Sequence, residues 1–357
     1  MSAMTGEAAA RRSPRRLLRP DAPGGTLGRC RDRRAARCTP TAHKVLPQLS
    51  AEQVHAALPW GPLADALAAA FMVPPVAPVR TAHALSSADT LLLMPAWNAQ
   101  AIGVKLVTVI PTAAHHGGHT VDASYLLLDR LTGAPRALLD GDALTVRRTA
   151  ATSALAARAL LAAAPTRLLV VGVGRLAPWM VRAYCALLPS LTQVELWGRD
   201  VPTAQRLATT LLDEGLPVSA ASRLDEAAAA ADIVSCVTTA HEPIVQGAWL
   251  RAGTHLDLVG GFTPGMREAD NAAVAGARIV VDHAESALRE AGDLVQPLAD
   301  GTLSRQQIVG DLGAVLRGEV IARRDARDRT LFKSVGHALE DLAAAQLAAA
   351  AHFPVTA

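Results

Sequence analysis

Two glycines at the end of an apolar run have the spacing of a dinucleotide-binding turn. Residues 168–177 read LLVVGVGRLA, so Gly172, Gly174 and the small Ala177 form the pattern Gly-x-Gly-x-x-Ala. The first glycine permits a tight turn, the second lets the backbone approach a pyrophosphate, and a small third residue lets a helix close on the strand. The first turn of that helix would offer N–H groups to the phosphates. By itself the motif is weak, because an alanine-rich chain can carry such a turn without a ligand.

The residues after the next predicted strand indicate which dinucleotide fits. Residues 194–197 (VELW) are followed by Gly198, Arg199 and Asp200. A carboxylate at this place binds the ribose 2′-hydroxyl of NADH, whereas a guanidinium suits the 2′-phosphate of NADPH. Arg199 therefore favours NADPH, with NADH as the second option, and its alternative role is that of a solvated loop arginine. Asp200 could instead cap the following helix, since Pro202 suits its first turn.

Three cations in the N-terminal part of the chain lie in otherwise apolar settings and could hold an anionic substrate. Lys105 interrupts residues 102–109 (IGVKLVTV), where a lysine is costly to bury without a partner. Arg148 immediately precedes a helix predicted from Thr149, and the positive end of that helix would add to the attraction for a carboxylate. Arg80 follows a proline-rich turn. The alternatives are a strand lysine whose amine reaches solvent, a surface arginine and a loop arginine.

A cluster of histidines raises the question of a metal. His115, His116 and His119 surround two glycines. No cysteine or carboxylate accompanies them at a matching spacing, and the neighbouring residues are typical of a loop. We therefore expect no metal site.

The predicted secondary structure places these residues in two different settings. Short strands separated by short links predict a mainly antiparallel α+β domain. The chain then changes to a strand–helix alternation, which predicts a parallel, doubly wound sheet beginning at the glycine turn. The first group of strands is expected at 90–94, 102–109, 123–129 and 136–139. The second group is expected at 168–173, 193–197, 217–220, 232–237, 254–259 and 278–281, with helices at 176–188, 202–214 and 224–230.

The overall fold class is therefore α/β, with a Rossmann-type doubly wound sheet inserted in an α+β domain. We expect residues 1–44 to be a disordered Arg/Pro-rich tail. Residues 45–147 together with 311–357 would form the α+β substrate-binding domain, because an apolar helix over 334–351 could return to it. Residues 148–310 would form the NAD(P)-binding Rossmann domain.

Composition excludes several classes of function. Of the 35 Lys and Arg and the 32 Asp and Glu, residues 1–44 hold eleven and three, which leaves 24 basic and 29 acidic residues. The body of the protein therefore has no excess of positive charge for nucleic acid. No uninterrupted apolar run approaches the roughly 18 residues that a membrane span needs. The four cysteines show no paired spacing, and we expect a cytoplasmic protein.

The chain resembles the ornithine cyclodeaminase/mu-crystallin family across almost all of residues 45–350. The matching stretches are LLLMPAW (91–97), GVKLVTV (103–109), residues 126–160, VVGVGRLA (170–177), LWGRD (196–200) and TLFKSVGHALEDLAAA (330–345). The resemblance implies an NAD(P)-dependent, typically homodimeric enzyme. It also implies a Rossmann domain inserted between the halves of a substrate-binding and dimerisation domain.

Within the family the chain is most similar to the Δ1-pyrroline-2-carboxylate reductases, especially at residues 257–270 (DLVGGFTPGMREAD). Cyclodeaminases carry an aspartate in a Gly-Ala-Asp-x-Pro-Gly-Lys segment, where it serves amine activation. Phe262 stands in its place, which argues against cyclisation of ornithine. Residues 111–120 (PTAAHHGGHT) also depart from the Gly-Leu-Pro-Thr segment of many relatives, so the preferred ring size stays open.

The resemblance implies reduction of a small cyclic imino acid. Hydride from NADPH, or NADH, would reduce Δ1-pyrroline-2-carboxylate to L-proline, with the six-membered piperideine homologue, giving L-pipecolate, as a second substrate. The alternatives are ornithine cyclodeamination, another amino-acid dehydrogenation, or a crystallin-like protein that binds NADPH without catalysis. The implied substrate-binding residues are Arg80, Lys105 and Arg148, with Lys105 as the catalytic candidate. The implied cofactor-binding residues are Thr149, Gly172, Gly174, Arg199, Thr238 and Val335.

Overall fold

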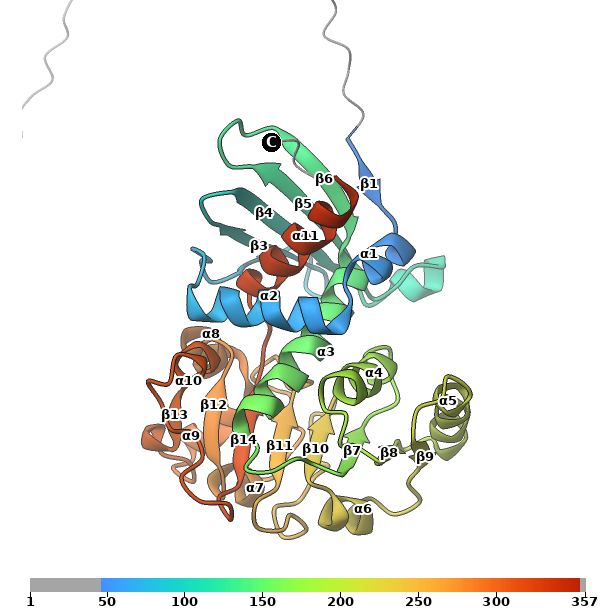
Figure 1. Ribbon diagram of the computed structural model, residues 1–357, viewed down its shortest axis with the longest axis vertical. Helices are drawn as coiled ribbons and strands as arrows, with labels where there is room; N and C mark the ends of the chain where they lie inside the picture. Colours follow the sequence, from blue (N-terminus) through green and yellow to red (C-terminus); the bar gives the residue numbers. More distant parts are fainter. Residues whose placement is uncertain (1–45, 354–357) are drawn as a thin grey trace, which may run out of the picture. The chain divides into compact units, whose positions relative to one another are not determined.

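The computed structural model of the chain describes residues 46–353, which form two β-sheets with their helices (Figure 1). One sheet has six strands in the order β1-β6-β5-β4-β3-β2. The other has eight strands in the order β13-β12-β14-β11-β10-β7-β8-β9. The tail 1–44, for which disorder is predicted, lies outside the described residues.

The six-stranded sheet is antiparallel from β2 to β6, and β1 joins its edge in parallel with β6. Its strands are β1 (Gln48–Leu49), β2 (Thr81–Ala84), β3 (Thr90–Trp97), β4 (Ala101–Val109), β5 (Val121–Asp129) and β6 (Pro135–Asp140). The four strands predicted here are confirmed. The two short edge strands were missed, because two residues in β1 and a fully exposed β2 carry no apolar alternation.

Four helices pack with this sheet: α1 (Ala51–Ala57), α2 (Trp60–Met72), the first half of α3 (Gly141–Leu160), and α11 (Ala338–His352). The alanine-rich α11 lies directly on β3, β4 and β5, and α2 packs against it (Figure 1). The small side chains of α11 allow this close approach, with Ala344, Ala345 and Ala348 fully buried. The C-terminal helix thus returns to the N-terminal sheet, as predicted.

The eight-stranded sheet is parallel throughout and confirms the predicted doubly wound, Rossmann-type arrangement. Its strands are β7 (Arg167–Val171), β8 (Gln193–Trp197), β9 (Val218–Ala220), β10 (Ile233–Cys236), β11 (His255–Leu258), β12 (Arg278–Val281), β13 (Ile308–Asp311) and β14 (Thr330–Lys333). The remaining helices are α4 (Ala177–Leu187), α5 (Val201–Asp213), α6 (Leu224–Ala230), α7 (Asn271–Ala275), α8 (Ala284–Glu290), α9 (Gly292–Ala299) and α10 (Leu312–Leu316), with 3-10 turns η1 (Ala113–His116) and η2 (Arg305–Gln307).

Two strands of this sheet were missed, β13 and β14. β14 lies between β11 and β12, although we assigned residues 311–357 to the substrate-binding domain. Its four residues, TLFK, end in a lysine, and a charged residue at a central strand position argues against a buried strand. The division of the chain into domains stays a prediction, but β14 belongs to the parallel sheet.

One buried carboxylate fixes α3 to the parallel sheet. Asp257 on β11 has no exposed surface and accepts hydrogen bonds from Ser153 of α3 (3.1 Å), Tyr184 of α4 (2.9 Å) and Ser235 of β10 (2.7 Å). Burial raises the pKa of Asp257 to about 6, although the three hydroxyl groups oppose the shift. A single side chain therefore connects two helices to two central strands.

Substitution of Asp257 should change how stability depends on pH. Because its pKa is raised in the folded state, its contribution is full below about pH 4 and is lost as the pH rises through about 6. We expect Asp257→Asn to gain about 2 kcal/mol of unfolding free energy relative to wild type between pH 4.5 and 7. Urea unfolding at several pH values measures this difference. A difference that stays constant with pH would show that Asp257 does not titrate in this range.

Candidate functional site

The glycine turn after β7 has the geometry that a bound pyrophosphate requires. Gly172 has φ +119°, and a Cβ there would lie 2.9 Å from the carbonyl oxygen of Val237, so only glycine fits. Gly174 has open space where a Cβ would be. Within the described chain, the N–H groups of residues 173–176 donate to no other residue, and α4 begins at Ala177. This row of unpaired donors at a helix N-terminus fits the phosphates of a dinucleotide.

The residues after β8 lie where the sequence places them. Arg199 is exposed and forms no ion pair with any residue in 46–353. Asp200 occupies the N-cap position of α5, but its carboxylate accepts a hydrogen bond from the Thr203 hydroxyl instead of a backbone N–H. The guanidinium of Arg199 is therefore available to an anion at this end of the glycine turn.

Lys105 and Arg148 meet in one buried ionic network. Lys105 on β4 is 3% exposed, and its Nζ donates to Oδ1 of Asp341 at 2.9 Å. Arg148 on α3 donates from Nε to the same oxygen at 3.0 Å and from Nη1 to Oε2 of Glu340 at 2.7 Å. Thr152 also donates to Glu340, at 3.0 Å. Two cations and two carboxylates thus balance each other in the interior.

The two carboxylates, Glu340 and Asp341, were missed in the sequence analysis. They come from the first turn of α11, where adjacent acids interrupt an alanine-rich apolar helix. Such acids are costly to bury unless cations meet them. A charged residue within an apolar run is the same signal that identified Lys105 on its strand.

The network shifts the protonation of its members. Burial lowers the pKa of Lys105 to about 8, against the attraction of Asp341. Burial would raise the pKa of Asp341, but Lys105 and Arg148 outweigh it and hold the pKa below its usual value. For Arg148, burial is outweighed by Asp341 and Glu340, so its pKa is raised. Lys105 is therefore a charged group that can lose its proton near physiological pH.

The expected position of Arg148 relative to α3 is wrong. The helix begins at Gly141 with Asp140 as its N-cap, so Arg148 lies in its second turn and not before its positive end. The start of the helix was predicted too late because Gly141, with Asp140 and Asp142 on either side, suggests a loop. A Cβ on Gly141 would lie 2.6 Å from the backbone of Ala123, which explains the glycine. Carboxylates, and not the helix dipole, stabilise the Arg148 guanidinium.

Arg80 and Arg148 both lie beside one segment, Val335–Gly336. Arg80 donates to the carbonyl oxygen of Val335 at 3.0 Å and forms an ion pair with Glu290 on α8. Gly336 has φ +82°, and a Cβ there would lie 2.9 Å from Nη2 of Arg148. This segment follows β14 and leads into α11. It therefore joins the parallel sheet to the cations of the other sheet.

Of the other residues predicted to contact the cofactor, Thr238 and Val335 follow strands of the parallel sheet, whereas Thr149 lies on α3. Thr238, after β10, donates from N and Oγ1 to Glu268 at 2.6 and 2.9 Å, and its Cγ2 faces Gly172. Val335 is buried, and its N–H donates to Asp282 at 2.8 Å. Thr149 is half-buried beside Arg148, and its hydroxyl has no partner among residues 46–353.

The histidine cluster is exposed. His115 and His116 lie in the short 3-10 turn and His119 follows it. Within residues 46–353, no group of three or more His, Cys, Asp or Glu side chains could hold a metal ion.

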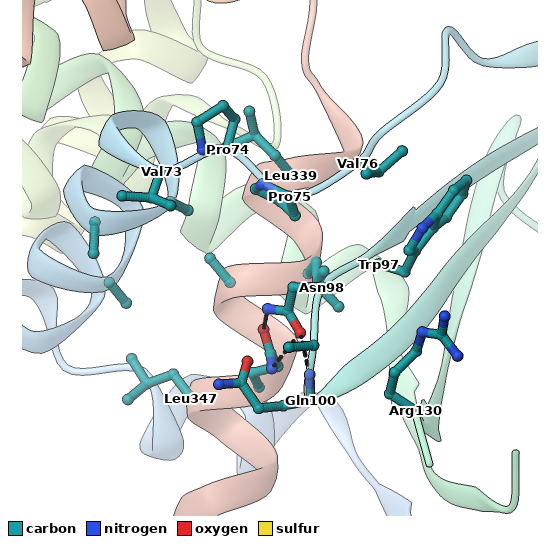
Figure 2. A pocket seen from close by; sticks show the side chains of 17 residues that line it. Val73, Pro74, Pro75, Val76, Trp97, Asn98, Gln100, Arg130, Leu339 and Leu347 are labelled. Carbon is teal, nitrogen blue, oxygen red and sulfur yellow. Dashed lines mark hydrogen bonds between the residues drawn. The ribbon is translucent and has the colours of Figure 1, made fainter. Parts of the chain in front are cut away.

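A groove on the described surface lies away from these residues. It encloses about 1030 Å³ between the end of α2, the β3–β4 turn and α11. Its lining is mostly apolar, and Asn98 and Gln346 are hydrogen-bonded within it at 2.9 Å (Figure 2). No member of the buried ionic network and no part of the glycine turn lines it, so we do not assign the chemistry to it.

Comparison with known proteins gives concordant results over most of the chain. The model of the ornithine cyclodeaminase/mu-crystallin family matches residues 49–350. A Δ1-pyrroline-2-carboxylate reductase of Colwellia psychrerythraea is 34% identical over 305 residues, covering 83% of this chain and 96% of that protein.

Two solved structures share the fold. Thermococcus litoralis Δ1-pyrroline-2-carboxylate reductase in complex with NADH and L-proline is 30% identical, with a TM-score of 0.81 over 86% of this chain and 98% of that one. An archaeal alanine dehydrogenase dimer with bound NAD is 25% identical, with a TM-score of 0.81 over 87% and 98%.

Loss of one carboxylate from the buried network should be far more costly than loss of a surface partner. Asp341→Asn would leave Lys105 and Arg148 without their shared anion, and we expect a loss of about 3–5 kcal/mol in unfolding free energy. The control is Asp142→Asn, which removes the partner of the half-exposed Arg175 (3.0 Å) and should cost less than about 1 kcal/mol. Urea unfolding measures both. Equal losses would contradict the role of the buried network in stability.

Proposed function

Because the chain belongs to the ornithine cyclodeaminase/mu-crystallin family, we propose that it reduces Δ1-pyrroline-2-carboxylate to L-proline with hydride from a nicotinamide dinucleotide. The observation that carries the proposal is the joining of two half-sites by Val335–Gly336. Val335 and Gly336 follow β14 of the sheet that carries the glycine turn, and they lie beside Arg80 and Arg148, the second of which shares Asp341 with Lys105. The Thermococcus litoralis enzyme, which has this fold, was solved with NADH and L-proline.

The cofactor would be held by the edge of the parallel sheet. The turn at Gly172 and Gly174 would receive the pyrophosphate, and Arg199 would bind a 2′-phosphate, which favours NADPH over NADH. Thr149, Thr238 and Val335 would contact it farther along. The bound dinucleotide supplies the hydride, and the chain supplies binding and orientation.

The substrate carboxylate would bind to Arg80, Lys105 and Arg148. Nε and Nη1 of Arg148 are committed to Asp341 and Glu340, whereas Nη2 has no partner within the described residues and lies beside Gly336. Lys105 would bind the same carboxylate as an ammonium and would raise the positive potential near the imine nitrogen. Fixing the carboxylate orients C2 toward the hydride donor, and such orientation is a large part of catalysis. An imine already protonated in solution needs no further acid.

Phe262 supports reduction over cyclodeamination. It lies in the loop after β11 and is 44% exposed, where the family resemblance places the cyclodeaminase aspartate. An aromatic ring cannot activate an amine, but it offers an apolar surface to a carbon ring. We propose the six-membered Δ1-piperideine-2-carboxylate as a second substrate on this ground.

We propose that two copies of the chain form a homodimer through the groove beside α11. Val73 and Val76, on its rim, are 80% and 55% exposed, which is unusual for valine unless a partner covers it. The archaeal alanine dehydrogenase was solved as a dimer. A monomeric mass in light scattering would contradict this assembly.

We also propose a cytoplasmic location. Cys185 and Cys236 are free thiols, which suits a reducing compartment. No helix of the described residues is long and apolar enough to cross a membrane. Cell fractionation tests the proposal, and recovery of the protein outside the cytoplasm would refute it.

Replacing Lys105 should separate turnover from cofactor binding. With Δ1-pyrroline-2-carboxylate and NADPH, we expect Lys105→Ala to lower kcat/KM at least about 100-fold, since the carboxylate loses an orienting cation. The NADPH Kd should stay within about threefold of wild type. In the wild type, kcat/KM should decline as the pH rises through about 8, where Lys105 loses its charge.

The control is Arg136→Ala, which removes a cation from β6 of the same sheet and should leave turnover unchanged. Loss of NADPH binding in Lys105→Ala would show a structural role for the lysine. Absence of turnover by the wild type with either ring size would refute the reductase assignment.

Replacing Arg199 should change the cofactor preference. We expect Arg199→Asp to lower the ratio of kcat/KM for NADPH to that for NADH at least tenfold, about 1.4 kcal/mol. The carboxylate repels a 2′-phosphate and can accept a hydrogen bond from a 2′-hydroxyl. Arg206→Asp, a charge reversal on the exposed face of α5, is the control. An unchanged preference in Arg199→Asp would refute its contact with the 2′-phosphate.

A further inference from the structure

Three buried ionisable side chains lie together beneath the edge of the parallel sheet. Glu268, Asp293 and Lys333 have no exposed surface. They come from the segment before α7, the first turn of α9 and the end of β14. Removing three charges from water is costly, and apolar side chains of similar size would often give equal or greater stability. None of the three takes part in the reaction proposed above, and their hydrogen bonds show which parts of the chain they hold in place.

The carboxylate of Glu268 binds two loops at once. Its Oε1 accepts hydrogen bonds from N and Oγ1 of Thr238, and its Oε2 accepts one from N of Gly260 at 2.6 Å. Thr238 follows β10 and Gly260 follows β11, so both loops lie at the carboxyl edge of adjacent strands. A Cβ on Gly260 would lie 1.8 Å from the carbonyl oxygen of Thr238. The two loops are therefore in direct contact, and one side chain sets their positions.

The loop after β10 also contacts the glycine turn of the proposed cofactor site. A Cβ on Gly172 would lie 2.9 Å from the carbonyl oxygen of Val237 and 3.2 Å from Cγ2 of Thr238. The strand order reverses between β7 and β10, which is where a doubly wound sheet binds its ligand. Since Arg199 after β8 would take the adenosine half, the loops after β10 and β11 face the other half, the nicotinamide.

Lys333 acts on Glu268 through Asp293. Its Nζ lies 3.2 Å from Oδ2 of Asp293, and Oδ1 of Asp293 accepts the backbone N–H groups of Glu268 and Ala269 at 2.8 and 3.1 Å. A Cβ on Gly261 would lie 2.3 Å from Asp293 Oδ2, so the pair also supports the loop after β11. Burial raises the pKa of Glu268 to about 7, and the positive charge of Lys333 opposes that shift.

We propose that Glu268, with Lys333 as its counter-charge through Asp293, is a positioning residue that forms the nicotinamide subsite. It holds the loops after β10 and β11 against the glycine turn. The inference rests on the proposed dinucleotide cofactor, but not on the identity of the substrate. Its consequence is that loss of Glu268 weakens binding of the nicotinamide ring and leaves the phosphate and adenosine contacts intact.

The test compares two ligands that differ only at the nicotinamide. Calorimetry with the full chain gives the affinities for NADPH and for 2′-phospho-ADP-ribose, which lacks that ring. We expect Glu268→Gln to weaken NADPH at least about tenfold and to change the fragment by less than about twofold. The amide NH₂ would face the N–H of either Thr238 or Gly260 and leave it unpaired. Methionine is close in size to lysine but uncharged, so Lys333→Met should likewise weaken binding of NADPH and leave binding of the fragment nearly unchanged.

The matched control is Asp257→Asn, which alters another fully buried carboxylate of the same sheet. Its partners are hydroxyl groups away from the two loops, so both affinities should stay unchanged. An equal loss of both ligands in Glu268→Gln and Lys333→Met, including loss through unfolding, would overturn the proposal. Unchanged NADPH binding would also overturn it. If the variants bind NADPH more weakly and the fragment as tightly as the wild type, but the wild type reduces no imine, only the proposed function is refuted.

Discussion

The pairing of Lys105 and Arg148 with the two carboxylates of α11 is the interaction on which the rest of the site depends. Four charges are removed from water, and each is tolerable only because the others are there. The pairing brings the C-terminal helix back onto a sheet formed some 200 residues earlier in the chain. It also leaves Nη2 of Arg148 unpaired within the described residues, so the same guanidinium that joins α3 to α11 keeps one free donor.

A short segment connects this buried ionic network to the parallel sheet. Val335 and Gly336 lie between β14 of the parallel sheet and the carboxylates of α11. Asp282 fixes both of their N–H groups, and Arg80 binds the carbonyl oxygen of Val335. Two residues before this segment, Lys333 enters the cluster that holds the loops after β10 and β11. Arg80, Arg148 and the loop after β11 thus all contact neighbouring residues of one strand and its extension, which limits how far they can move relative to one another.

Local patterns in the sequence were sufficient to predict much of the fold and some of the residues that meet in the candidate site. The spacing of the glycines, the alternation of strands and helices, and the lysine within the apolar run 102–109 are all short-range signals. The predicted strands are present, and Lys105 is buried beside a carboxylate. Glu340 and Asp341 were missed because their meaning depends on partners almost 200 and 236 residues away. β14 was missed because Lys333 is acceptable in a central strand only beside Asp293. Arg148 was placed before its helix because Gly141 resembles a turn until its contact with Ala123 is known.

In the proposed reaction, hydride passes from the cofactor to C2 of a cyclic imino acid where the two half-sites meet. The test uses NADPH with both hydrogens at C4 of the nicotinamide replaced by deuterium, together with unlabelled Δ1-pyrroline-2-carboxylate, followed by mass spectrometry and NMR of the product. We expect L-proline carrying one deuterium at C2. Proline without the label at C2, or oxidation of the cofactor without formation of proline, would contradict it.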